Sequence, residues 1–116
     1  MLSRNRVAIR FFMASTRDFL DFVLEQLSLL SDIDYRAMMG EYIIYYRGKV
    51  IGGIYDNRFL VKPTKSALEI IPNAPREIPY PGGRPMIMVT DIENRELLAN
   101  LFNKMYPELP DTKKTK

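Results

Sequence analysis

Residues 35–62 read YRAMMGEYIIYYRGKVIGGIYDNRFLVK, and this stretch decides the fold. Tyrosine, isoleucine, valine and phenylalanine dominate it, and these residues are enriched in β-strands. Turn-forming residues interrupt it three times, at Gly40, at Arg47-Gly48 and at Asp56-Asn57. Turns at such short intervals predict an antiparallel meander. Its four strands are expected at 35–39, 41–46, 49–55 and 58–62.

Both faces of the second predicted strand are apolar. Tyr42, Ile44 and Tyr46 share one face, because successive side chains of a strand point to opposite sides. Ile43 and Tyr45 share the other face. We therefore expect helices to cover one face of the sheet and the second face to be partly buried. In the third strand, the glycines at 52 and 53 weaken the strand and indicate a bulge or a close backbone approach.

Helical patterns precede and follow the meander. Apolar residues spaced three and four apart predict a helix over about 16–30, which Ser15 is placed to cap. Thr64 is the expected cap of a short second helix, which ends by Pro72 because proline cannot continue a helix.

The last third of the chain begins with a proline-rich stretch. Residues 72–85 hold five of the eight prolines and predict a stiff, extended loop. A brief apolar strand is expected at 86–89. Thr90 with Glu93 then forms a capping-box pattern before a final helix, which ends at Pro107.

The predicted order is helix, four strands, helix, strand, helix (α-β-β-β-β-α-β-α). Such a chain folds as a two-layer α+β domain, in which helices pack on an antiparallel sheet made of the meander and one further strand. The domain is expected to span residues 13–110, with Met13 as a natural start. Residues 1–12 are interpreted as a disordered extension and residues 111–116 as a disordered basic tail. The apolar stripes predict one core, made of Phe19, Phe22, Val23, Leu27, Ile44, Ile54, Leu60, Leu98, Leu101 and Phe102.

The composition excludes several kinds of chemistry. The 116 residues include no cysteine and no histidine, so a disulfide, a thiol nucleophile and the usual zinc ligands are excluded. The G-x-x-x-x-G-K-[ST] and G-x-G-x-x-G patterns of phosphate and dinucleotide loops are also missing. No residue is therefore predicted to be catalytic or to bind a metal or cofactor, and an enzyme is the least favoured class.

Charge is distributed unevenly along the chain. The formal net charge is +3, but residues 13–110 contain 11 basic and 13 acidic residues, so the basic excess comes from the two ends. A nucleic-acid-binding domain normally presents a basic face. Direct nucleic-acid binding through the basic ends and exposed tyrosines is thus an alternative that the core charge does not favour. Arg10 interrupts the N-terminal apolar residues, so we expect neither a secretory signal nor a membrane span, and predict a cytoplasmic location.

The meander also carries a family pattern. It resembles the N-terminal domain of the TfoX/Sxy competence-regulator family, and the resemblance extends over about residues 14–106. The matching positions are Arg36, Met38, Gly40, Tyr42, Tyr45, Gly48, Asp56, Leu60 and Lys62. Met39 stands where the family often has phenylalanine, and Glu41 stands where a second glycine is common.

This resemblance implies a secretion-chaperone-like α+β fold and a function without catalysis. Full-length members carry a second, helical domain and act with the cyclic-AMP receptor protein at competence promoters. By analogy, we expect a bacterial, stand-alone first domain that serves as a protein-interaction module. Its partner is expected to be another protein, such as a regulator or a component of the transcription machinery.

Arg36 is the one candidate site residue. It follows the acidic loop Asp32-Ile33-Asp34 at the start of the first predicted strand. A guanidinium can form a forked, charge-assisted pair with a carboxylate, and lysine cannot reproduce that geometry. Two interpretations stay open: a structural pair with that loop, with Glu41 or with Asp56, or a contact with an anion or a partner.

Overall fold

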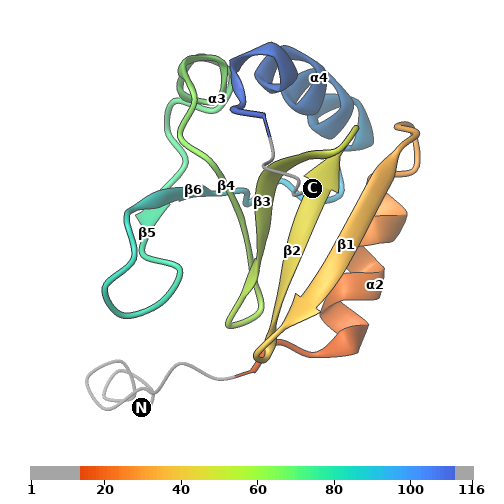
Figure 1. Ribbon diagram of the computed structural model, residues 1–116. Coiled ribbons are helices and arrows are strands. Elements are labelled where there is room, and N and C mark those ends of the chain that lie inside the picture. The colour runs from red at the N-terminus through yellow and green to blue at the C-terminus, as the bar shows by residue number, and fades with distance from the viewer. Residues whose placement is uncertain (1–13, 112–116) are drawn as a thin grey trace.

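The structure, a computed structural model, describes residues 14–111 (Figure 1). The predicted extension at 1–12 and the tail beyond residue 111 lie outside the described residues. In chain order, the elements are α2 (Arg17–Gln26), β1 (Ile33–Met38), β2 (Glu41–Tyr46), β3 (Lys49–Tyr55), β4 (Arg58–Val61), α3 (Lys65–Ile70), β5 (Arg76–Glu77), β6 (Met86–Met88), α4 (Arg95–Met105) and the 3-10 helix η1 (Tyr106–Glu108).

The strands form one antiparallel sheet in the order β1-β2-β3-β4-β6-β5. This confirms the predicted two-layer α+β fold with its antiparallel meander. The hairpins follow from the chemistry of their turns, since Arg47 and Gly48 have φ angles of 51° and 86°, and Asp56 and Asn57 have 55° and 54°. Two successive positive φ angles are characteristic of the type I′ turn, whose twist matches that of the flanking strands.

β5 is absent from the sequence prediction. Its two residues lie inside the proline-rich stretch, where they pair with β6 through Arg76 opposite Ile87 and Glu77 opposite Met86. The amide of Met88 also donates to the carbonyl oxygen of Pro75, at 2.9 Å. No local pattern indicates this strand, because its hydrogen-bonding partner is supplied by a later part of the chain.

The first helix is shorter than predicted and has a different cap. Thr16 is the N-cap, and its hydroxyl oxygen accepts a hydrogen bond from the amide of Phe19 at 3.1 Å. The hydroxyl oxygen of Ser15 instead accepts from the amide of Asn57, at 3.0 Å, in the turn between β3 and β4. The helix ends at Gln26 rather than near residue 30, because the chain turns there to enter β1.

Of the two N-caps predicted for the later helices, that of α3 is confirmed and that of α4 is wrong. Thr64 caps α3 as expected, by accepting from the amide of Ala67 at 3.1 Å. The capping box of Thr90 and Glu93 does not form, because Asn94 caps α4 and accepts from the amide of Leu97 at 3.0 Å. Asparagine is as good an N-cap as serine or aspartate, so the helix begins at the later residue.

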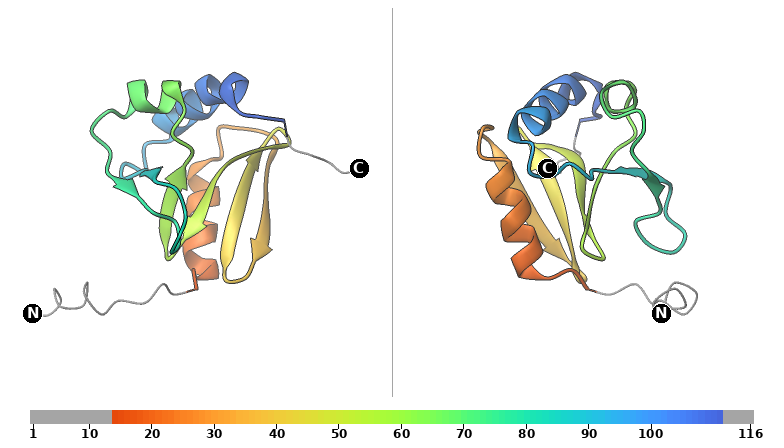
Figure 2. Two further views of the ribbon diagram at one scale, coloured as in Figure 1. Left: turned by 60° about the vertical axis from the view of Figure 1, so that its left-hand side comes forward. Right: turned by 180° about the vertical axis from the view of Figure 1, so that it is seen from behind.

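The helices and the core lie on one side of the sheet. Seen from behind, α2 lies in front of β1 and β2, and α3 lies beside α4 at one end of the sheet (Figure 2). The buried cluster contains Leu20, Val23, Leu27, Ile44, Tyr46, Ile51, Ile54, Phe59, Val61, Ala67, Ile87, Val89, Leu98, Leu101, Phe102, Met105 and Leu109.

Three predicted core residues are absent from this cluster, although two of them, Phe19 and Phe22, pack against it. Phe19 and Phe22 are only partly buried, because the stripe of α2 that faces the sheet includes the fully buried Leu20 instead. Leu60 is fully buried but does not belong to the cluster beneath the helices. Its neighbours Phe59 and Val61 do belong to it, so Leu60 points to the opposite face.

Candidate functional site

The sheet face opposite the core, which we call the open face, carries no helix within the described part of the chain (Figure 2). Its side chains alternate along the strands with those that point toward the core. They include those of Asp34, Arg36 and Met38 of β1, Ile43 and Tyr45 of β2, Tyr55 of β3, Leu60 of β4, Lys62 directly after it, and Met86 and Met88 of β6.

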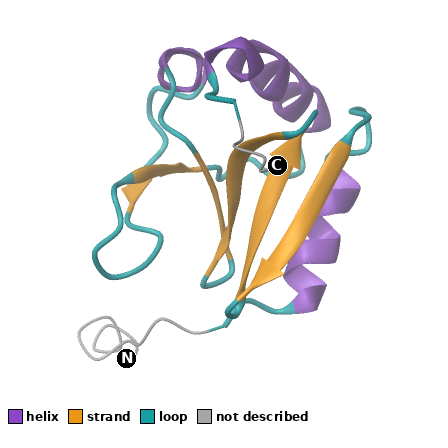
Figure 3. Ribbon diagram, in the orientation of Figure 1, coloured by secondary structure: helices purple, strands orange, loops and turns teal. Residues whose placement is uncertain are grey.

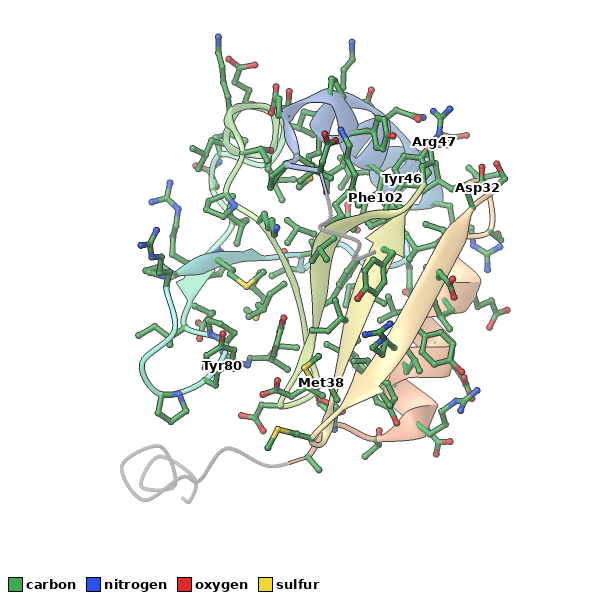
Figure 4. All side chains as sticks on the ribbon, viewed as in Figure 1. Asp32, Met38, Tyr46, Arg47, Tyr80 and Phe102 are labelled. Carbon is green, nitrogen blue, oxygen red and sulfur yellow. The ribbon has the colours of Figure 1, made fainter. Side chains whose placement is uncertain are left out.

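A single connection folds over part of this face. Residues 78–85, which we call the proline loop, link β5 to β6 (Figure 3). Tyr80 lies on this loop, and Met38 lies at the end of β1 (Figure 4). The ring of Tyr80 packs against the ring of Tyr55 on β3, with 6.0 Å between the ring centroids. The open face is therefore covered at β3, β4 and β6 and exposed at β1.

Arg58 holds the proline loop in place. Its Nη1 donates to Oε1 of Glu77 at 3.1 Å, and its Nη2 donates to the carbonyl oxygens of Ile78 and Pro79 at 3.1 and 3.3 Å. Its Nε donates to the carbonyl oxygen of Tyr55, at 3.1 Å. One planar guanidinium thus ties β3 and β4 to the last residue of β5 and to the first two residues of the proline loop, so the loop has a defined position above the sheet.

A cleft of about 580 Å³ lies between the proline loop and the sheet. Its size is within the usual range for ligand pockets, roughly 300–1,000 Å³. The lining residues are Val50, Gly52, Tyr55, Lys62, Pro63, Pro79, Tyr80, Gly82, Gly83, Arg84, Pro85 and Met86. Two of them, Lys62 and Arg84, are cations, and none is a carboxylate. The cleft therefore combines apolar and aromatic walls with positive charge.

Neither cation has a carboxylate partner within residues 14–111. Lys62 is half-buried, and this burial lowers the pKa of its amine. Burial lowers the pKa of a lysine because it disfavours the charged form, and an opposite charge nearby reverses the effect. An anion in the cleft would consequently gain a charge-assisted contact with an amine that has lost part of its hydration.

Tyr55 provides a polar group in the wall of the same cleft. The side chain is only 6% exposed, yet its hydroxyl has no hydrogen-bond partner among the described residues. Buried tyrosine hydroxyls usually have one. Burial, with smaller contributions from Glu41 and Tyr80, raises the pKa of Tyr55 to about 12, so the hydroxyl stays protonated and can donate.

Gly53 makes room for this tyrosine. A Cβ atom on Gly53 would lie 2.6 Å from the carbonyl oxygen of Tyr42 and 2.8 and 2.9 Å from ring carbons of Tyr55. The register also shifts nearby, since Tyr45 pairs with Val50 whereas the adjacent Ile44 pairs with Gly52. The bulge or close approach that the glycine pair predicts is thus confirmed, and its consequence is a tyrosine ring that lies against the sheet.

Arg36 lies on the open face of β1, outside the cleft. Its side chain is exposed, and within residues 14–111 it forms none of the ion pairs with Asp32, Asp34, Glu41 or Asp56 that its structural interpretation requires. Contact of Arg36 with a partner or an anion stays a prediction.

Sequence reasoning missed the residues of the cleft. Lys62 was matched only as part of a family pattern, and Arg84 lies in a stretch that reads as an ordinary proline-rich loop. The close glycine pair was the one local signal that something packs tightly on β3. Tyr55 and Tyr80 are brought together by the proline loop, which no periodicity predicts.

The described residues provide neither a cluster of metal-ligating side chains nor a membrane-spanning helix. No group of three or more acidic side chains there is arranged to hold a metal ion. In the same part of the chain, every helix is too short or too polar to cross a membrane.

The fold and the cleft define a small α+β domain with helices on one face of its sheet and a cationic, aromatic cleft on the other. The chain is 31% identical, over 105 residues, to the uncharacterised 12.7 kDa protein in the trpE 5′ region of Spirochaeta aurantia. The match covers 90% of this chain and 91% of that protein, so the chain belongs to the same family. No protein-family profile and no solved structure matches the chain.

Proposed function

We propose that the protein is a cytoplasmic, non-enzymatic interaction module that holds an acidic segment of a partner protein in the cleft beneath the proline loop. The observation that carries the proposal is a set of groups there that have no partner within residues 14–111: the cations of Lys62 and Arg84 and the buried hydroxyl of Tyr55. All three can bind a carboxylate, and no carboxylate lines the cleft to compete.

The distribution of charge supports a protein partner over a nucleic acid. Residues 14–111 contain 11 basic and 14 acidic residues, so the folded part would repel a long polyanion. A short acidic segment places its carboxylates at the two cations and leaves the rest of the surface uncontacted. The aromatic rings and prolines of the cleft are suited to the apolar parts of such a segment.

The resemblance to the N-terminal domain of the TfoX/Sxy family extends the proposal to regulation. In that family, the regulators act together with another protein at promoters. The partner is accordingly proposed to be a regulator or a component of the transcription machinery. The cleft is the surface that would contact it.

Photo-cross-linking tests the proposal. Tyr80, which is 45% exposed at the mouth of the cleft, is replaced by benzoylphenylalanine, and cross-linked peptides from the native cell are sequenced by mass spectrometry. We expect one partner segment rich in aspartate and glutamate. Cross-links to nucleotides, to segments without carboxylates, or to nothing at all would contradict the proposal.

Matched charge variants show whether the cations carry the contact. Replacing Lys62 and Arg84 together by glutamine should remove the cross-link, because each charge-assisted hydrogen bond contributes about 1.5–3 kcal/mol. Replacing the exposed Lys65 and Arg76 by glutamine changes the net charge equally but leaves the cleft intact, so that cross-link should persist. Equal cross-linking by both variants would mean that the cleft does not select by charge.

A further inference from the structure

β1 is an edge strand of the sheet and pairs with β2 on one side, and among residues 14–111 no strand pairs with its other side. The amide of Arg47 donates to the carbonyl oxygen of Asp32, at 2.9 Å, so the polar backbone groups of Asp32 face β2. In an antiparallel pair, every second residue of a strand directs its backbone amide and carbonyl toward the neighbouring strand. The backbone groups of Asp34 and Arg36 therefore also face β2. The amides and carbonyls of Ile33, Tyr35 and Ala37 consequently face outward.

A side-chain contact agrees with this alternation. The amide of Tyr35 donates to Oδ1 of Asp34 at 3.0 Å, which an amide bonded to β2 would not do. Charged side chains on an edge strand commonly prevent unwanted pairing with other strands. The carboxylate of Asp34 thus occupies an outward-facing amide of the edge strand. When another strand pairs with this edge, that amide donates to the new strand, and the carboxylate needs a different hydrogen-bond donor.

The sequence of β1 is complementary to itself. When two copies of Ile33-Asp34-Tyr35-Arg36-Ala37 pair antiparallel about Tyr35, each Asp34 lies opposite the partner's Arg36 and each Ile33 opposite the partner's Ala37. The pairs centred on outward-facing residues exchange both backbone hydrogen bonds. The pairs of Asp34 with the partner's Arg36 lie between these and are not hydrogen-bonded through the backbone, so their side chains approach most closely. Each carboxylate therefore contacts a guanidinium on the open face.

Neighbouring registers are disfavoured by the same charges. Only shifts of two residues keep the outward-facing groups opposite one another. A shift in one direction places Asp34 opposite Asp34, and a shift in the other places Arg36 opposite Arg36. Like charges directly opposite each other in a sheet are destabilising. The strand therefore specifies one register with its own copy.

We propose that the protein forms a two-fold symmetric dimer through β1, in which Asp34 of each protomer pairs with Arg36 of its partner and the two sheets become continuous. The interface is isologous, because the same strand contributes on both sides. Arg36, which is exposed and unpaired within residues 14–111, acquires its carboxylate there. The cleft beneath the proline loop lies over β3, β4 and β6, so it stays accessible in the dimer.

Sedimentation of the full chain over a range of concentrations tests the dimer. We expect Asp34→Arg alone and Arg36→Asp alone to weaken dimerisation roughly tenfold or more, because each places like charges opposite one another. Mixing the two variants should restore association as a heterodimer, since every charged pair is again of opposite sign. Arg76→Asp is the control for Arg36→Asp, because it changes the net charge equally but lies on β5. It should dimerise like the wild type.

A backbone variant makes the test independent of charge. Ala37→Pro removes an outward-facing amide and leaves the hydrogen bonds between β1 and β2 in place, so it should abolish the dimer while circular dichroism shows an unchanged fold. A wild type that is monomeric up to about 1 mM would reject the proposal. So would folded charge variants that dimerise as the wild type does, or that fail to associate with each other on mixing.

Discussion

The guanidinium of Arg58 donates to Oε1 of Glu77 at 3.1 Å, and this contact joins a central strand of the sheet to the short strand from which the proline loop departs. The arginine side chain is only 13% exposed. Because the same guanidinium also binds the carbonyl oxygens of Ile78 and Pro79, it determines where the wall of the cleft lies.

Arg58→Lys should lower both the stability of the protein and the order of the proline loop. The lysine keeps the charge but cannot donate in several directions at once, so we expect a loss of about 1–2 kcal/mol in urea unfolding. Hydrogen exchange should become faster at Gly82 and Gly83. Arg17→Lys is the control, because its pair with Asp21 is exposed on both sides and should change stability by less than about 0.5 kcal/mol.

Tyr55 should make folding sensitive to alkaline pH. Its folded-state pKa of about 12 exceeds the ordinary value of 10.0, so the folded protein holds this proton more tightly than the unfolded chain. The associated stability is present below pH 10 and is lost as the pH rises toward 12, with a total of about 2–3 kcal/mol. Unfolding free energies measured across this window should fall less steeply in Tyr55→Phe. An identical slope in that variant would show that another group is responsible.

Lys62→Met should stabilise the protein and weaken its proposed function. Burial lowers the pKa of Lys62, so the folded state disfavours the charged amine, and this cost is relieved as the pH rises toward 10.5. At neutral pH we expect a gain of about 0.5 kcal/mol in thermal or urea unfolding, a small figure because solvent still reaches the amine. The partner cross-link at residue 80 should decrease in the same variant. A loss of stability would mean that Lys62 has a stabilising contact in the folded protein.

Gly53→Ala should be destabilising even though alanine is a small residue. Its methyl group would overlap the carbonyl oxygen of Tyr42 and the ring of Tyr55, and overpacking of this kind costs about 1–3 kcal/mol. Gly48→Ala provides a contrast, because no atom lies within 4 Å of the added Cβ and only its positive φ angle of 86° is unfavourable. If Gly53→Ala melted at the wild-type temperature, the ring of Tyr55 would not lie where the structure has it.

The helices and hairpins were predictable where local chemistry decides them. Arg47-Gly48 and Asp56-Asn57 form tight turns because these residues tolerate positive φ angles, whatever the remainder of the chain does. Thr64 caps α3 for a similarly local reason. The start of α4 was misplaced because Thr90 and Asn94 are both competent caps, and local sequence does not rank them.

The candidate site was not predictable in the same way. Lys62 and Arg84 line one cleft only because β4 and β6 pair antiparallel and the loop before β6 folds back over the sheet. The tyrosine at residue 55 reads as one of several aromatic residues in a strand, and its burial depends on Tyr80 in that loop. Arg36 was identified because it matches the family pattern and follows the acidic loop Asp32-Ile33-Asp34. That it forms no ion pair within residues 14–111 depends on the tertiary structure.

By itself, the sequence determined an antiparallel meander flanked by helices and the absence of histidine and cysteine chemistry. These properties depend on periodicity, turn residues and composition, all of which act between near neighbours in the chain. Only the tertiary structure decided which face of the sheet stays without helices, where β5 pairs, and which cations meet a buried hydroxyl. Those outcomes depend on contacts between residues far apart in sequence, and the free energy of such contacts is defined only once the strands and helices have packed together.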